Sequence, residues 1–177
     1  LPSAVTMMNL GMGVISLMFT FNHQFRWAAV FVLLAVVMDT LDGLVARKLN
    51  ASSDFGKELD SLSDLVSFGV APAFMVLELV QAFPMIGFQN GMVVAASILF
   101  ILCGAYRLAR FNVLNITEYF VGVPITMAGM IIALLVLSMP GLVGWVYIAA
   151  LFALSVLMVS RIFVPKFFKS RANKFSA

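Results

Sequence analysis

All five aspartates of the 177-residue chain fall within 26 consecutive positions, from Asp39 to Asp64. Asp39 and Asp42 are three residues apart. Asp60 and Asp64 are four apart. Because successive helical residues are about 100° apart, each pair projects from one helix face. Carboxylates that share a pocket repel each other unless a cation lies between them, and oxygen ligands without His or Cys favour Mg²⁺, Mn²⁺ or Ca²⁺. The spacing therefore predicts a site for hard divalent cations.

Such a four-carboxylate cluster can hold two divalent ions about 4 Å apart, an arrangement typical of phosphoryl transfer. Gly43 and Gly56 flank the acids at positions where a missing side chain lets a phosphate or nucleotide approach the backbone. Arg47, one helical turn beyond Gly43, can supply a bidentate cation to the same phosphates. Asp54 and Glu58 are more simply explained as parts of a solvated loop.

The helices that position these acids are expected to cross a membrane, because 63% of the residues are hydrophobic and only 11% are charged. A bilayer core of roughly 30 Å needs about 20 apolar residues per helix, so 177 residues fit about six spans and no separate soluble domain. The sequence predicts an all-α polytopic membrane protein with one domain, residues 1–177. The expected spans are Ala4–Phe21, Arg26–Ala46, Gly56–Leu79, Gly91–Ala109, Gly122–Ser138 and Val143–Val164.

The basic residues predict the orientation of these spans. With six spans, ten of the eleven Lys and Arg residues fall on one side and Arg26 alone falls on the other. Since Lys and Arg near span ends stay in the cytoplasm, both termini are expected there, in a protein of the plasma membrane. The acids lie on the same side, at the end of the second span and the start of the third, so the site should face the cytoplasm. Two helices joined by a short loop are antiparallel neighbours, which lets the two acidic pairs face each other.

The acids and their neighbours also carry a resemblance to a known family. The pattern D-x2-D-G-x2-A-R-x8-G-x3-D-x3-D, which runs from Asp39 to Asp64, resembles the signature of the CDP-alcohol phosphatidyltransferases. The predicted six-span layout is similar to the transmembrane core of that family. The resemblance therefore implies the CDP-alcohol phosphotransferase fold over essentially the whole chain.

Three further segments, Glu58–Pro72, Tyr106–Asn112 and Phe120–Gly129, resemble the membrane-embedded phosphatidylserine synthases of bacteria and archaea. This narrower resemblance implies transfer of a phosphatidyl group from CDP-diacylglycerol to the hydroxyl of L-serine, with release of CMP. It also implies a homodimer in the lipid bilayer. No feature indicates a nucleic-acid partner.

The resemblance assigns roles by position. Two cations, Mg²⁺ or Mn²⁺, would be held by Asp39, Asp42, Asp60 and Asp64. Asp64 matches the proposed general base, which takes the proton of the serine hydroxyl. The positions that match the neighbourhood of the cytidine and pyrophosphate are Gly43, Ala46, Arg47 and Gly56, with Thr6 and Asn9 in the first span.

Arg107 and Arg110 are the candidates for binding the serine carboxylate, because they are three residues apart at the cytoplasmic end of the fourth predicted span. The same arginines would also serve as ordinary positive-inside anchors. Ser67 and Asn112 are candidate hydrogen-bonding partners of the amino acid. The alternative for a serine in a membrane helix is a bond to its own backbone or to a neighbouring helix.

Other functions fit parts of the pattern. A sister transferase would use glycerol 3-phosphate or inositol phosphate as the acceptor, and an archaeal ether lipid as donor would give archaetidylserine. A divalent-cation transporter would also need acids, but at several depths and on several spans, whereas here they are confined to one side.

Overall fold

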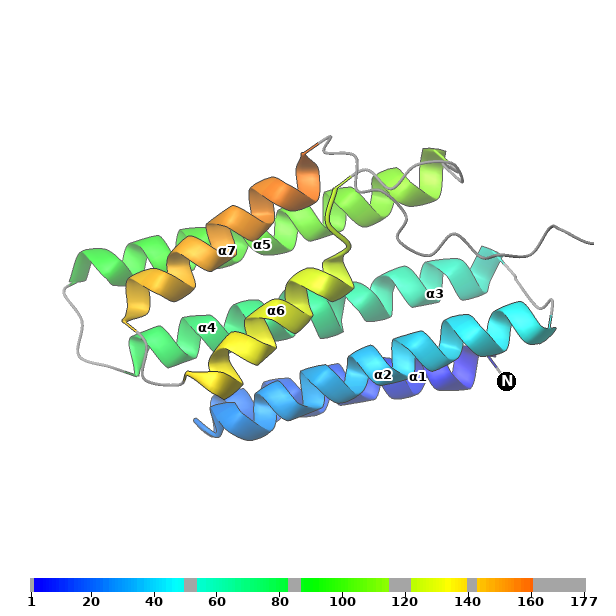
Figure 1. The fold of residues 1–177 in the computed structure, drawn as a ribbon, viewed down its shortest axis with the longest axis horizontal. Coiled ribbons are helices and arrows are strands. Elements are labelled where there is room, and N and C mark those ends of the chain that lie inside the picture. The colour runs from blue at the N-terminus through cyan, green and yellow to red at the C-terminus, as the bar shows by residue number, and fades with distance from the viewer. Residues whose placement is uncertain (1, 50–53, 83–86, 115–121, 140–142, 161–177) are drawn as a thin grey trace, which may run out of the picture.

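The computed structural model describes residues 2–49, 54–82, 87–114, 122–139 and 143–160. Within these ranges the chain is helical and contains no strand. The helical segments are α1 (Pro2–Phe21), α2 (Phe25–Leu49), α3 (Asp54–Asp64), η1 (Leu65–Val70), α4 (Ala71–Gln81), α5 (Gly87–Leu114), α6 (Ile125–Ser138) and α7 (Gly144–Val159). Because α3, η1 and α4 follow one another without a break, the described segments form six elongated rods (Figure 1).

The rods correspond to the six predicted spans, and the differences lie at their ends. The fourth rod runs from Gly87 to Leu114, so it continues five residues beyond the predicted end at Ala109. The fifth begins at Ile125 rather than Gly122, because Pro124 has an extended backbone (ψ 142°) before the first helical turn. The predicted end of the last span at Val164 lies outside the described residues.

The third rod changes its helical geometry in the middle. The π-helical segment η1 begins directly after Asp64, and the backbone N–H of Ala71 donates to the carbonyl of Val66 instead of to a residue four positions back. Pro72 follows within the first turn of α4 and has no backbone N–H to give. π-Segments inside α-helices occur frequently at functional sites. Here the segment separates the acidic end of the rod from its apolar end.

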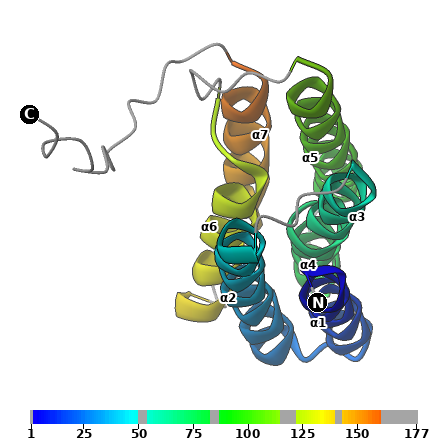
Figure 2. The same cartoon turned by 90° about the vertical axis from the view of Figure 1, so that its right-hand side faces the viewer.

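This third rod is the centre of the bundle. Its α4 segment contacts α1, α2, α5, α6 and α7. The bundle has three layers, with α1 and α2 on one side, α4 and α6 in the middle, and α5 and α7 on the other side (Figure 2). In an apolar stretch of the third rod within residues 54–81, 67% is buried, against 28% in the corresponding stretches of α1 and α5. The central core is built from Phe68, Met75, Val76 and Leu79, each at most 2% exposed.

The outer surface of the bundle is apolar, as expected for helices in lipid. In the described parts of the chain, three helical segments are long and apolar enough to cross a membrane, namely Ala4–Phe21, Asp54–Gln81 and Asn90–Val113. The apolar helices Ile125–Ser138 and Gly144–Val159 are shorter. Large apolar side chains such as Met18, Leu102 and Phe152 are more than half exposed. In water such a surface would be an aggregation hazard, whereas in a bilayer it faces the acyl chains.

Small and hydroxyl-bearing residues join the rods. Ser16 Oγ donates to the carbonyl of Ala28 at 2.9 Å and thereby ties α1 to α2. Gly129 of α6 meets the backbone of the central rod, since a Cβ built there would lie 2.8 Å from both Cα and O of Phe68. In a membrane, where lipid is as apolar as the side chains, such close backbone approach is a main source of helix association.

We expect Gly129→Ala to destabilise the bundle, because the added methyl group meets backbone atoms that cannot rotate away. Overpacking of this kind costs roughly 1–3 kcal/mol. The measurement is the thermal unfolding midpoint of the detergent-solubilised protein. Gly91→Ala is the matched control, since a Cβ at Gly91 has no atom within 4 Å. Equal midpoints for the two variants would contradict the close contact between α6 and η1.

Candidate active site

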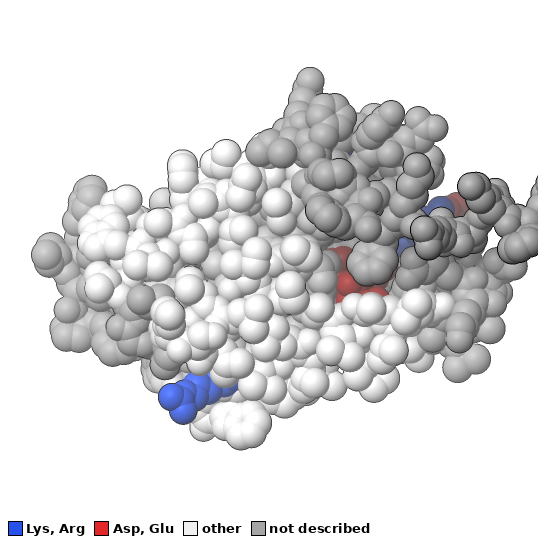
Figure 3. All heavy atoms as spheres, viewed as in Figure 1, with Lys and Arg blue, Asp and Glu red and all other residues white. Residues whose placement is uncertain are grey.

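Three carboxylates from two rods converge near the end of the bundle where α3 begins. Asp39 comes from α2, and Asp60 and Asp64 come from α3. One oxygen of each lies within 4.8 Å of the others. Figure 3 shows red atoms of acidic residues at the surface in the half of the molecule that contains α3. The prediction that acids of the second and third spans face each other is confirmed for these three residues.

The cluster is strained electrostatically unless positive charge joins it. Asp64 is only 8% exposed, and Asp39 and Asp60 are half-buried. At a separation near 5 Å and an effective dielectric constant of about 20, two like charges repel by roughly 3 kcal/mol. Carboxylate oxygens at these distances form a donor set that suits a hard divalent cation such as Mg²⁺, Mn²⁺ or Ca²⁺. The described residues therefore fit the predicted cation site.

The other signature positions are placed by the backbone. Asp42, Ala46 and Arg47 lie on α2 beyond Asp39, and their side chains are outside the described residues. Gly43 is exposed on α2, and Gly56 is half-buried on α3. The two glycines thus lie on the same two rods as the acids. Room for a ligand between α2 and α3 remains a prediction from the sequence.

The first helix turns a polar stripe toward the central rod. The stripe consists of Thr6, Asn9, Gly13, Ser16 and Thr20, at alternating spacings of three and four, and all five are buried. Asn9 Nδ2 lies 3.4 Å from Asp64 Oδ1. Asn9 Oδ1 is buried and has no hydrogen-bond partner among the described residues. Thr6 and Asn9 thus lie on the α1 face that meets the acidic cluster.

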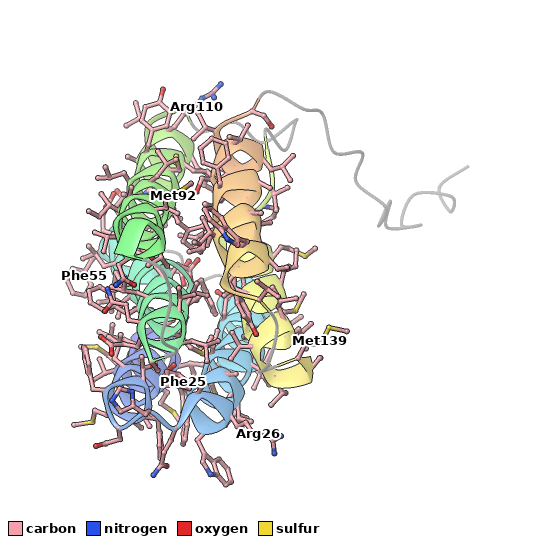
Figure 4. The ribbon with its side chains drawn as sticks, turned by 90° about the vertical axis from the view of Figure 1, so that its left-hand side faces the viewer. Phe25, Arg26, Phe55, Met92, Arg110 and Met139 are labelled. Atoms are coloured by element: carbon pink, nitrogen blue, oxygen red, sulfur yellow. The ribbon has the colours of Figure 1, made fainter. Side chains whose placement is uncertain are left out.

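The two candidate arginines of α5 lie differently. Arg107 is half-buried, and its charge acts on Asp64. Its Nε is buried without a hydrogen-bond partner in the described part of the chain. Arg110 points outward from the end of α5 (Figure 4). Arg107 is therefore the arginine of α5 whose charge acts on the cluster, through Asp64.

Ser67 and Asn112 both bond to neighbouring helices. Ser67 Oγ donates to the backbone carbonyl of Asn9 at 3.0 Å and is fully buried. Asn112 Nδ2 donates to Ser61 Oγ at 3.0 Å and lies 3.4 Å from Glu58 Oε1. Both side chains thus link the central rod to another helix. For Ser67, this is the alternative that the sequence offered for a serine in a membrane helix.

The sequence reasoning missed Ser61, Gly13 and the packing role of α1. Asn112 reaches Ser61 because α5 continues as a helix past Ala109, where the sequence predicted a loop. The signal for α1 was present as the alternating spacing of small and polar residues, which marks a helix-packing face in an apolar segment.

Ser63, next to Asp64, is fully buried and its Oγ has no partner among the described residues.

An apolar cavity elsewhere in the bundle lacks the groups needed for chemistry. It measures about 440 Å³ and lies between α5 and α7, with Met92, Leu99, Trp145 and Phe152 among its lining residues. No acid lines it. The acidic cluster, rather than this cavity, is therefore the candidate active site.

Comparison with known proteins agrees with the geometry. A protein named CDP-diacylglycerol–serine O-phosphatidyltransferase in Methanocaldococcus jannaschii is 39% identical, over 92% of this chain and 72% of its own length. A protein of the same name in Bacillus subtilis is 34% identical, over 98% of this chain and 94% of its own length. The archaetidylserine synthase of Methanothermobacter thermautotrophicus is 38% identical, over 94% of this chain and 70% of its own length.

The family model for CDP-alcohol phosphatidyltransferase matches residues 1–159, a range that contains α1 to α7 and every acid of the cluster. The match thus covers both the helical bundle and the carboxylates that it brings together. The chain therefore belongs to the CDP-alcohol phosphatidyltransferase family.

Proposed function

We propose that this protein transfers the phosphatidyl group of CDP-diacylglycerol to the hydroxyl group of L-serine, which gives phosphatidylserine and CMP. The observation that carries the proposal is the convergence of Asp39, Asp60 and Asp64, with the charge of Arg107 acting on Asp64. Acids that suit phosphate-bound cations thereby lie within electrostatic reach of a guanidinium that suits the carboxylate of an amino acid. The names of the relatives in Methanocaldococcus jannaschii and Bacillus subtilis support the same substrates.

The reaction exchanges a phosphoanhydride bond for a phosphoester bond. A bond forms between the serine Oγ and the phosphorus of the phosphatidyl group, and the bond from that phosphorus to the bridging pyrophosphate oxygen breaks. The electron pair of the broken bond stays with CMP. Asp64 accepts the proton of the serine hydroxyl, because an alcohol is a poor nucleophile at neutral pH without a positioned base.

The donor set supports two divalent cations, Mg²⁺ or Mn²⁺, on Asp39, Asp42, Asp60 and Asp64. When bound, such ions would offset the negative charge of the pyrophosphate and of CMP as it leaves. The surrounding residues orient the nucleotide. We assign this role to Gly43, Ala46, Arg47 and Gly56 on the two acidic rods, with Thr6 on α1.

Arg107 is the residue that we assign to the serine carboxylate. A buried guanidinium N–H without a partner costs free energy, and a carboxylate would satisfy it with a charge-assisted hydrogen bond. Arg110 points away from the bundle and suits the membrane surface instead (Figure 4). Ser67 and Asn112 are engaged with Asn9 and Ser61, so we assign them to the support of the site.

We also propose six membrane spans with both termini and the active site on the cytoplasmic side of the plasma membrane. Arg26 lies at the start of α2, 13 residues before Asp39. At 1.5 Å per residue, this puts it roughly 20 Å from the acids along the helix axis. Arg26, the one basic residue on the predicted outer side, thus lies far from the acids along α2, which supports the orientation predicted from the basic residues. A homodimer is proposed from family resemblance alone.

The archaetidylserine synthase among the relatives favours one variation, a donor with ether-linked chains. The chemistry at phosphorus and serine is unchanged by the linkage in the lipid tails. Comparison of ester and ether forms of the donor in the same assay decides between them.

Detergent-solubilised protein should release CMP from CDP-diacylglycerol when serine and Mg²⁺ or Mn²⁺ are present. EDTA should abolish this release, and added divalent ions should restore it, because the clustered carboxylates cannot all stay ionised around the donor without them. The readouts are CMP release and incorporation of radiolabelled serine into lipid. Preference for glycerol 3-phosphate or inositol phosphate would assign a sister reaction, and absence of CMP release with any acceptor would favour a transporter.

Asp64→Asn should lower the turnover number at least 100-fold, because the amide cannot accept the hydroxyl proton. The matched control is Glu78→Gln, which also replaces an acid by its amide and lies in α4, at the other end of the same rod. The turnover number is measured at saturating serine and donor. Equal turnover of Asp64→Asn and wild type would remove Asp64 as the base.

Arg107→Ala should raise the KM for serine roughly ten- to a hundredfold, as expected for a lost hydrogen bond to a charged group, and leave the KM for CDP-diacylglycerol nearly unchanged. Arg110→Ala is compared in parallel, and Arg26→Ala at the far end of α2 is the control. If Arg110→Ala alone raised the KM for serine, the carboxylate role would pass to Arg110.

A further inference from the structure

We infer that α1 is a positioning element for Asp64. In this inference Asn9 holds the carboxylate of Asp64, and Ser67 and Gly13 fix the position of Asn9. This inference rests on the proposed function, in which Asp64 takes a proton from serine. It differs from a nucleotide contact for Asn9 and from a substrate contact for Ser67. Three independent contacts between α1 and the central rod carry it.

The first contact joins Asn9 to Asp64. Asn9 is 1% exposed and its Nδ2 lies 3.4 Å from Asp64 Oδ1. The amide N–H₂ end must face the carboxylate, since two oxygen acceptors would repel each other. The contact therefore occupies one oxygen of Asp64 with a neutral donor and restricts rotation of the carboxyl group. The two residues are 55 positions apart, so only the packing of α1 on α3 creates this contact.

The second contact fixes Asn9 itself. Ser67 Oγ donates to the backbone carbonyl of Asn9 at 3.0 Å. A hydroxyl in a helix commonly bonds back to its own helix, as Ser155 does to the carbonyl of Leu151 at 2.7 Å. Ser67 instead reaches across to α1 from the π-segment η1, three residues after Asp64. The rod that carries Asp64 thus also holds the backbone of Asn9, whose side chain donates to Asp64.

The third contact sets the distance between the helices. Gly13 lies one turn beyond Asn9, and a Cβ built on it would be 2.5 Å from Ser67 Oγ and 2.8 Å from Ser67 Cα. Any side chain at this position would therefore push α1 away from η1. Asn9 would move with α1 and lose its contact with Asp64. Gly13 has no functional group of its own, so its effect on the reaction can only be positional.

The test is Gly13→Ala, with Gly11→Ala as the matched control on the same helix, because a Cβ at Gly11 has no atom within 4 Å. Gly13→Ala should lower kcat roughly 10- to 100-fold, the usual cost of losing an outer partner of a ligating side chain, with both KM values retained. Asn9→Ala should do the same. The double variant should be no slower than Asn9→Ala alone, because both changes break one contact.

Ser67→Ala removes the tie without adding atoms, so it tests the inference even if Gly13→Ala does not fold. It should also lower kcat and retain the KM for serine. A raised KM for serine at unchanged kcat would make Ser67 a substrate ligand, and a raised KM for CDP-diacylglycerol in Asn9→Ala would make Asn9 a nucleotide ligand. Either result, or additive losses in the double variant, would overturn the positioning role.

Mn²⁺ binding measured by electron paramagnetic resonance gives a second readout that needs no acceptor. Gly13→Ala should weaken Mn²⁺ binding relative to Gly11→Ala, because Asp64 is no longer held in position by Asn9. If wild-type protein incorporates no serine but this difference in Mn²⁺ binding is present, the proposed reaction fails and the positioning inference stands. If wild type is active and both glycine variants match it in kcat and Mn²⁺ binding, the positioning inference fails alone.

Discussion

The repulsion among buried carboxylates is the constraint on which this structure depends. Asp39, Asp60 and Asp64 present oxygens within 4.8 Å of one another in a bundle whose described core is mostly apolar. Each ionised pair costs roughly 3 kcal/mol at this separation if nothing offsets the charge. A sequence retains such a cluster when a bound cation compensates it and when the bundle is rigid enough to hold the oxygens in place.

Rigidity comes from the central rod and its neighbours. The apolar end, α4, contacts every other rod and fixes the rod in the bundle, while the acidic end, α3, is tied to α5 through Asn112 and Ser61. Between them, η1 brings Ser67 onto α1 and Phe68 onto α6. The π-segment therefore connects stability to chemistry, because the residues that lock the helices together begin immediately after Asp64.

Polar groups on several helices serve support as well as chemistry. Ser67 and Asn112 have the residue types of substrate ligands, yet both bond to neighbouring helices. Arg107 has the residue type of a membrane anchor, yet its Nε is buried and its charge acts on Asp64. In an apolar environment a donor or acceptor needs a partner wherever it is, so residue type alone does not separate a ligand from a helix link.

Sequence alone determined the helical class, the six rods and the acidic cluster, because these follow from local periodicities: long apolar runs, helical spacing and the pattern from Asp39 to Asp64. Tertiary structure decided the continuation of α5 past Ala109, the contact of Asn9 with Asp64, and the difference between Arg107 and Arg110. These depend on which helix faces meet and how closely. That outcome is set by packing between residues far apart in the sequence, such as Ser67 and Asn9, which are 58 positions apart, and no local spacing encodes it.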